Sequence, residues 1–281
     1  FIVVLDAGHG GNDPGNIGNG YKEKNIVLNI VLEVGKILEA ESNFKVIYTR
    51  KTDVFIKLHE RAPIANKADA DLFVSVHCDA FTSPKAYGAG TFVLGLHRNK
   101  DNFRIAQNEN SVIFLEEDHE TTYEGFDPNN PESVISLVLM QETYNSQSIE
   151  AANTIQKSFV TNLNRKDRTV KQAGFLVLRE TYMPSVLVEV GFLTNKKEGA
   201  YLNSKSGQRE MANTISKAVL NYKKQLQASV VKEDQAVLVA EQQAPLEIEE
   251  PAQESSAKGV VFKVQIAASA KSIDLTKKNF K

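Results

Sequence analysis

The chain has 281 residues, 42% of them hydrophobic, which is enough for one large domain or for one domain with appendages. Its formal net charge of −2 and pI near 6.3 give no electrostatic case for nucleic-acid binding, which requires a clustered basic surface. No apolar run is long enough to cross a bilayer. The single cysteine, Cys78, excludes an internal disulfide framework.

The first residues have the pattern of a buried strand that ends in a glycine-rich turn. The apolar run Phe1–Leu5 favours a strand buried on both faces, and residues 6–11, Asp-Ala-Gly-His-Gly-Gly, follow it. Glycines let the backbone turn tightly and approach a ligand closely. Glu23 then precedes the segment Asn25–Ala40, whose apolar residues have nearly helical spacing. The turn therefore predicts a ligand site, either a phosphate cradle or a metal site.

Strands and helices alternate through the first hundred residues. The pattern predicts a helix at Leu58–Ala68 and strands at Phe44–Thr49, Leu72–Val76 and Gly90–Leu96, with two short strands later at Phe175–Leu178 and Val186–Val190. Such alternation is typical of an α/β fold. We expect a mostly parallel sheet of about six strands flanked by helices.

The alternation breaks after residue 102. Phe103–Phe114 has a helical pattern, but residues 115–131 are acidic and rich in turn-forming residues. Loops of that length inside a compact domain are usually functional or disordered. Helical patterns resume at Ser133–Leu163 and at Gln208–Leu226.

The composition changes again near residue 227. Residues 230–258 are rich in Gln, Glu, Ala and Pro and contain no aromatic residue, so they bury too little apolar surface to offset their ordering entropy. We interpret residues 1–226 as one domain and residues 227–258 as a flexible linker. The alternating run Val260–Ala267 then predicts a new strand, so residues 259–281 are interpreted as the first part of a second domain.

The candidate site residues lie at strand ends. The opening turn lacks both the Gly-Lys-Ser/Thr of a P-loop and the Gly-x-Gly-x-x-Gly spacing, which excludes a phosphate cradle of either kind. His9 and His77 each follow a buried strand, and residues there converge on the ligand crevice of an open α/β sheet. With Glu23 they form the His/Glu/His set that suits catalytic zinc, with water in the fourth position. Zinc lowers the pKa of that water toward ~7.

A fourth residue stands out because it is an acid in an apolar run. Glu189 lies within Val-Leu-Val-Glu-Val-Gly-Phe at residues 186–192, where an unpaired carboxylate is costly. It is the candidate for the group that takes and returns the proton of water. The structural alternative is an ion pair with Arg179 or Arg61. Cys78 faces away from His77 in a strand and is expected to pack in the sheet.

Four separated motifs in this order resemble the zinc-dependent N-acetylmuramoyl-L-alanine amidases of bacterial cell-wall turnover. They are residues 4–15 (VLDAGHGGNDPG), 22–24 (KEK), 75–80 (SVHCDA) and 188–195 (VEVGFLTN), and the similarity covers residues 1–226. The resemblance implies hydrolysis of the amide between N-acetylmuramic acid and L-alanine of the stem peptide. It implies that His9, Glu23 and His77 bind zinc and that Glu189 is the catalytic carboxylate. The family usually has Asn where Cys78 stands, a position that is not a ligand.

The resemblance also implies regulation and location. Some cell-division members carry an inserted helix that plugs the active site with a carboxylate until an activator protein removes it. Residues 102–131 fall at that place, so we expect Glu116 or Glu117 to approach the zinc in a resting state. Residues 261–267 resemble the opening strand of a SPOR-type peptidoglycan-binding domain. The family and its peptidoglycan substrate imply a periplasmic protein, with a signal peptide outside this chain.

Two alternatives stay open at the level of sequence. One is a peptidoglycan-binding or regulatory protein that has an amidase scaffold and no turnover. The other is a zinc peptidase that acts on the stem peptide, which only product analysis separates from an amidase, because both need the same metal and base.

Overall fold

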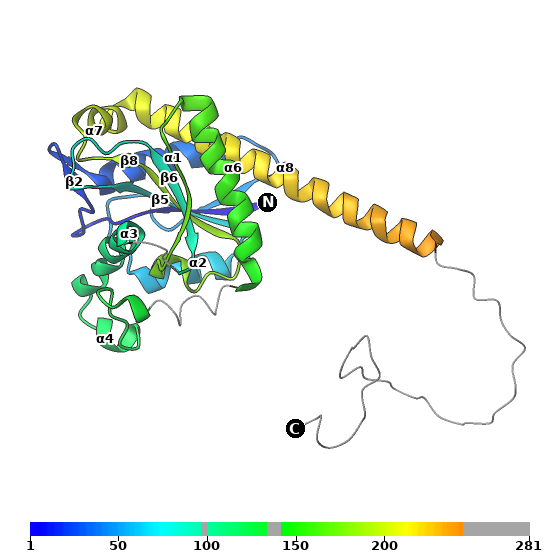
Figure 1. Ribbon diagram of the computed structural model, residues 1–281, viewed down its shortest axis with the longest axis horizontal. Coiled ribbons are helices and arrows are strands. Elements are labelled where there is room, and N and C mark those ends of the chain that lie inside the picture. The colour runs from blue at the N-terminus through cyan, green and yellow to red at the C-terminus, as the bar shows by residue number, and fades with distance from the viewer. Residues whose placement is uncertain (97–99, 134–141, 244–281) are drawn as a thin grey trace, which may run out of the picture. The chain divides into compact units, whose positions relative to one another are not determined.

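A six-stranded sheet organises the protein in the computed structural model, which describes residues 1–96, 100–133 and 142–243 (Figure 1). In sheet order the strands are β4 (Lys45–Tyr48), β1 (Ile2–Ala7), β5 (Leu72–Asp79), β8 (Ser185–Phe192), β6 (Ala89–Leu94) and β7 (Asp167–Ala173). All neighbouring strands are parallel except β8 and β6. The predicted mostly parallel α/β sheet is confirmed.

Helices cover both faces of the sheet. One apolar cluster joins the sheet to α1 (Glu23–Glu39), α6 (Asn145–Leu163), α7 (Lys196–Asn203) and α8 (Lys205–Gln243). A second cluster lies on the other face, against α2 (Leu58–Lys67), α3 (Lys100–Asn110) and the 3-10 segments η1 (Ser111–Leu115) and η4 (Leu176–Leu178). None of the described helices is long and apolar enough to cross a membrane.

The remaining described elements are short. They are the two-stranded sheet of β2 (Ile17–Gly18) and β3 (Tyr21–Lys22), the short helix α4 (His119–Thr122), and the 3-10 segments η2 (Pro131–Ser133) and η3 (Glu142–Tyr144). The hairpin of β2 and β3 leads directly into α1, so it sets where the first helix begins.

One predicted strand is wrong and one strand was not predicted. Phe175–Leu178 contains the 3-10 segment η4, because a short buried apolar run does not by itself distinguish a strand from a helical turn. The sixth strand is instead β7, Asp-Arg-Thr-Val-Lys-Gln-Ala. It is an edge strand that pairs only with β6, so it lacks the apolar pattern of a buried strand.

The last described helix is longer than the sequence predicts. α8 continues through residues 227–243, the first part of the predicted flexible linker, up to the last described residue. Gln, Ala, Lys and Glu in this part are good helix formers. The chain divides into two compact units, residues 1–233 and 234–281. The rest of the linker and the SPOR-like segment 259–281 lie outside the described residues, as do residues 134–141 of the predicted helix Ser133–Leu163.

Candidate metal centre

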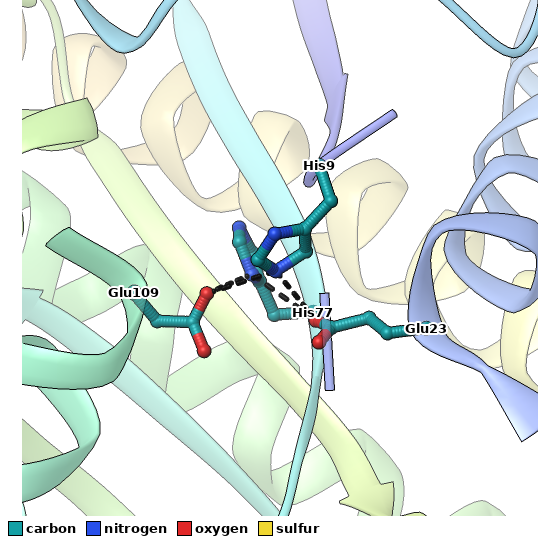
Figure 2. A group of neighbouring side chains, drawn as sticks. All are labelled: His9, Glu23, His77 and Glu109. Carbon is teal, nitrogen blue, oxygen red and sulfur yellow. Dashed lines mark ion pairs between the residues drawn. The ribbon is translucent and has the colours of Figure 1, made fainter. Parts of the chain in front are cut away.

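Two neighbouring strands bring the predicted imidazoles together. β1 and β5 are parallel and in register, with Ala7 opposite Val76, so His9 after β1 and His77 near the end of β5 meet at one edge of the sheet. Their ring centroids are 5.0 Å apart. Glu23, the first residue of α1, points between them and is fully buried (Figure 2). The structure therefore assembles the three residues that the sequence predicts as ligands.

Two glycines permit this close approach. A Cβ atom at Gly8 would lie 2.4 Å from Cε1 of His77, a distance that real Cβ atoms do not reach. A Cβ atom at Gly15 would lie 2.6 Å from the ring of His9 and 2.7 Å from Glu23 Oε2, and Gly15 has a left-handed φ of +65°. Side chains at Gly8 and Gly15 would therefore occupy the space of the imidazoles and the carboxylate.

A fourth side chain joins the three predicted residues. Glu109, near the end of α3, approaches from the side opposite Glu23 (Figure 2). Its Oε2 atom lies 3.0 Å from His9 Nε2 and 2.8 Å from His77 Nδ1. Both ring nitrogens also lie 3.2 Å from Glu23 Oε1. The four ligand atoms all lie within 4.8 Å of one another.

The spacing of this cluster is compatible with a bound metal ion. Ligand atoms about 2.0–2.2 Å from a tetrahedral zinc ion would be roughly 3.4 Å from one another, and the four imidazole–carboxylate separations here are 2.8–3.2 Å. His9 Nε2, His77 Nδ1 and Glu109 Oε2 are buried, and none of them forms a hydrogen bond among the described residues, although they lie at ion-pair distance from one another. Buried polar atoms without hydrogen bonds are costly, so their convergence on one point indicates a site for a cation. Two imidazoles with carboxylates form a donor set that suits zinc.

Two of the ligands are held by further groups. His9 Nδ1 lies 2.7 Å from Asp13 Oδ2, so the ring donates to a carboxylate and directs Nε2 toward the cluster. Glu23 accepts the backbone N–H groups of Asn16 and Cys78, each at 2.7 Å. The thiol of Cys78 is buried in the first apolar cluster, which confirms that this side chain packs in the core.

The carboxylates and imidazoles of the cluster shift one another's pKa values. Burial disfavours the charged imidazolium, but the carboxylates of Glu109 and Glu23 outweigh it and raise the pKa of His77 to about 9. The pKa of His9 is likewise raised well above its usual value by Glu23 and Glu109. Despite burial, the two imidazoles lower the pKa of Glu23. The carboxylates therefore favour positive charge between them, which a divalent cation would also supply.

Glu189 lies beside this cluster. It is the cross-strand partner of His77, and its side chain is 2% exposed. Neither of its carboxylate oxygens has a hydrogen-bond partner among the described residues. Burial and the neighbouring carboxylates of Asp79 and Glu109 raise its pKa well above the usual value. An acid in this state is suited to hold and release a proton.

The ion pairs that would have given Glu189 a structural role are not formed. Arg61 pairs instead with Asp6, at 2.7 Å, and Arg179 pairs with Glu180. The carboxylate of Glu189 is thus free of the cations that the sequence offered as partners.

The structure does not bring Glu116 or Glu117 to the cluster. The buried carboxylate of Glu116 accepts the backbone N–H of Leu58 at 3.1 Å and the hydroxyl of Tyr123 at 2.9 Å, so it caps the first turn of α2. Glu117 is exposed. The carboxylate that reaches the predicted ligands is Glu109, in the helix that precedes the acidic stretch.

Sequence reasoning missed Glu109, although a signal was present. The buried residues of α3 include Ile105 and Ala106, and Glu109 follows them at helical spacing on the same face. An acid that continues an apolar helical face raises the same question as Glu189 in its apolar strand. The acidic composition of residues 115–131 instead favoured Glu116 and Glu117.

Polar contacts dock α3 on the sheet. The side chain of Asn110 donates to Gly174 O at 2.7 Å and accepts the N–H of Leu176 at 2.9 Å. Arg104 donates to Ala80 O at 3.1 Å, and its guanidinium lies over the ring of Phe81. These contacts, with Ile105 and Ala106 in the second apolar cluster, hold Glu109 over the metal ligands. An open space of about 380 Å³ remains beside Glu109, lined in part by His9 and Asn16.

Comparisons with known proteins agree with the resemblance seen in the sequence. The family model described as N-acetylmuramoyl-L-alanine amidase matches residues 3–221. The amidase AmiA of Escherichia coli K12 is 35% identical over 224 residues, which cover 79% of this chain and 75% of AmiA.

Solved structures agree as well. The N-acetylmuramoyl-L-alanine amidase of Clostridium difficile 630 matches with a TM-score of 0.60 and 28% identity, over 80% of this chain and 97% of that one. The CwlD amidase of Clostridioides difficile, solved in complex with the GerS lipoprotein, matches with a TM-score of 0.58 and 25% identity, over 79% of this chain and 98% of that one.

Proposed function

The chain belongs to the N-acetylmuramoyl-L-alanine amidase family, peptidoglycan hydrolases that cleave the amide between N-acetylmuramic acid and L-alanine, and we propose that it does so as a zinc enzyme under autoinhibition. The observation that carries the zinc assignment is the convergence of buried atoms of His9, His77 and Glu109, none of which forms a hydrogen bond among the described residues, with the carboxylate of Glu23.

His9, Glu23 and His77 would hold the metal. A zinc ion bound there supplies a Lewis acid that polarises the amide carbonyl and lowers the pKa of water toward ~7. The ligands supply the orientation, because His9 is fixed by Asp13 and Glu23 by two backbone N–H groups. With two neutral imidazoles and one carboxylate as ligands, a bound divalent ion would retain one net positive charge beside the reacting carbonyl.

Glu189 moves the proton in this proposal. Its carboxylate takes a proton from the attacking water and passes it to the nitrogen of the departing L-alanine, so that the amine leaves in neutral form. The support is its position beside His77 on the next strand and the absence of any partner among the described residues that would compete for its oxygens.

Glu109 keeps the site closed in the resting state. Its Oε2 atom lies where a fourth ligand would lie, and a carboxylate there excludes both water and the substrate carbonyl. α3 is held by hydrogen bonds of Arg104 and Asn110 and by the apolar contacts of Ile105 and Ala106, so an activator that binds the helix or the following segment would have to replace these contacts to withdraw it. A partner protein has a precedent in the CwlD relative, which was solved with GerS.

The wider setting follows from the substrate. We infer a periplasmic enzyme of cell division and daughter-cell separation, with residues 1–226 as catalytic domain, 102–131 as regulatory insertion, 227–258 as connection and 259–281 as the beginning of a SPOR-like peptidoglycan-binding segment. The support is the peptidoglycan substrate of the family and the closed arrangement of α3. Localisation of a fluorescent fusion to the division septum tests this inference.

Two other functions compete with this proposal. A non-catalytic peptidoglycan-binding protein would not need a buried, unpaired Glu189, so that residue argues against it. A zinc peptidase that cleaves within the stem peptide would need the same metal and base. Mass spectrometry of digested sacculi separates the peptidase from the amidase, because only the amidase releases peptides with a free L-alanine amine.

Two variants of the full chain test the residue roles. Glu189→Ala should keep zinc, measured by metal analysis, and lose hydrolysis of sacculi by about 10²–10⁴-fold. His77→Ala should lose both. A Glu189→Ala protein that hydrolysed sacculi at the native rate would overturn the role of Glu189.

A further inference from the structure

The side of His77 that faces away from the metal cluster contacts a chain of buried groups. Its Nε2 atom lies 3.0 Å from Ser75 Oγ, and Ser75 Oγ lies 2.6 Å from Asp6 Oδ2. Ser75 and Asp6 are fully buried. The two strands that carry these residues are adjacent, with Asp6 opposite Ser75 in the register of β1 and β5.

The direction of these hydrogen bonds follows from the charge of Asp6. Arg61 Nη1 lies 2.7 Å from its Oδ1 atom, and Thr49 Oγ1 donates to the same atom at 2.6 Å. Burial favours a neutral acid, but Arg61 and the two hydroxyls lower the pKa of Asp6 below its usual value. An ionised carboxylate only accepts, so Ser75 donates its single hydroxyl proton to Asp6.

The tautomer of His77 follows from the direction of the Ser75 hydrogen bond. Because the hydroxyl proton of Ser75 points to Asp6, Ser75 Oγ can only accept from the imidazole, and His77 Nε2 must carry a hydrogen. The lone pair of the neutral ring is then on Nδ1, the atom that faces Glu23 and Glu109. Ser75 thus fixes both the orientation of the ring and the nitrogen that is free to bind a metal.

We propose that Ser75 and Asp6 are positioning residues that hold His77 in the Nε2–H tautomer and so set the affinity of the site for zinc. The inference rests on the proposed zinc function. It assigns the two imidazoles different supports: His9 donates directly to the carboxylate of Asp13, whereas His77 reaches a carboxylate through a neutral hydroxyl.

Asp6 also has a structural role, which determines the choice of test. Its partner Arg61 donates to the backbone carbonyl groups of Ala7 and His9, so a substitution at Asp6 would leave a buried guanidinium without its carboxylate. Ser75 can be changed without breaking that pair. Thr49 offers the matched control, because it also donates a hydroxyl to Asp6 at 2.6 Å but does not reach His77.

Zinc affinities of the full-length wild type, Ser75→Ala and Thr49→Val, measured by competition with a chromophoric chelator, test the proposal. Removing a group that orients a metal-binding imidazole typically weakens binding 10–100-fold, so Ser75→Ala should lose about that factor and Thr49→Val less than about threefold. Equal zinc affinities of Ser75→Ala and wild type, or equal losses of affinity in both variants, would overturn the positioning role of Ser75. A wild type that bound no zinc would overturn the proposed function as well.

A second measurement does not depend on how the variants fold. Long-range ¹H–¹⁵N correlation spectra of the zinc-loaded wild type distinguish protonated from metal-bound ring nitrogens. The proposal expects a hydrogen on His77 Nε2 and the metal on Nδ1, with the opposite assignment for His9. A metal-bound Nε2 in His77 would contradict it even if every variant were unstable.

Discussion

His77 and Glu189 are cross-strand partners in the register of β5 and β8. One is a proposed metal ligand and the other the proposed proton carrier, so a single strand pairing fixes their separation. The register shifts after His77, which ends the regular pairing just beyond the site. The chemistry of the site therefore depends on main-chain geometry in the most buried part of the sheet.

Glu109→Ala should raise the basal hydrolysis of purified sacculi. Removing the carboxylate frees the fourth position beside His9 and His77 and leaves α3 in place. We expect an increase on the order of tenfold or more, which corresponds to ~1.4 kcal/mol of preference for the closed state. Dye release from labelled sacculi measures it. Glu117→Ala, at an exposed position, is the control, and equal rates in both variants would refute autoinhibition by Glu109.

Deletion of residues 111–131 tests the wider regulatory segment. The segment follows Glu109 directly and includes Glu116, whose carboxylate caps α2. Without it α3 loses its C-terminal connection, so hydrolysis of sacculi by the purified protein should rise. No rise in the deletion variant would count against a regulatory role of this segment.

Glu116→Ala should reduce stability without activating the enzyme. It removes the acceptor of Leu58 N–H and of the Tyr123 hydroxyl, and unpaired buried donors cost about 1–3 kcal/mol. Denaturant unfolding should show that loss, while zinc content stays at the wild-type level. Hydrolysis of sacculi that increased as much as in Glu109→Ala would restore Glu116 as the blocking residue.

The metal-free protein should lose stability as the pH rises. The pKa of His77 is about 9 in the folded protein against 6.5 for the unperturbed side chain, so its contribution is complete below pH ~6.5 and disappears as the pH passes ~9. The raised pKa values of His9 and Glu189 act in the same direction. Thermal unfolding with a chelator present should show a falling Tm across this window. A Tm that rose from neutral pH to pH ~9 would contradict the charge assignment.

Gly8→Ala should disrupt the metal site. Its Cβ atom would lie within 2.4–2.8 Å of three atoms of the His77 ring, so the ring must move, at a cost of about 1–3 kcal/mol. We expect loss of zinc from the purified protein. Gly20→Ala is the control, because it has a left-handed φ of +82° but nothing within 4 Å of the added atom. Retention of zinc in Gly8→Ala would show that the turn is looser than the structure indicates.

The sequence predicted the sheet and three members of the cluster because those signals are local. Buried strands have continuous apolar runs, and residues at the ends of parallel strands share one edge, so His9 and His77 were placed together. β7 was not predicted, because an edge strand with solvent on one side keeps charged residues. The Gln-, Glu- and Ala-rich composition of residues 227–243 predicted a linker, although these residue types are also good helix formers, so the length of α8 was underestimated.

The position of the Glu109 carboxylate depends on tertiary contacts that local sequence patterns do not show. The carboxylate reaches the site because Asn110 and Arg104 dock α3 on the ends of the strands, and neither contact has a sequence signature. Glu116 lies in the acidic stretch expected to block the site, but its carboxylate accepts hydrogen bonds from Leu58 N–H in α2 and from the Tyr123 hydroxyl. The acidic composition of residues 115–131 predicted the wrong glutamate for the cluster, and only the three-dimensional contacts distinguish Glu109 from Glu116.

Product analysis with the Glu109→Ala protein tests whether the chain is a zinc-dependent amidase. Purified sacculi are digested with and without a zinc chelator, and the soluble products are identified by mass spectrometry. A zinc-dependent amidase should release stem peptides that begin with a free L-alanine amine, leave glycan strands with intact lactyl groups, and release nothing when zinc is removed. Cleavage within the stem peptide, or undiminished release in the presence of the chelator, would contradict a zinc-dependent amidase.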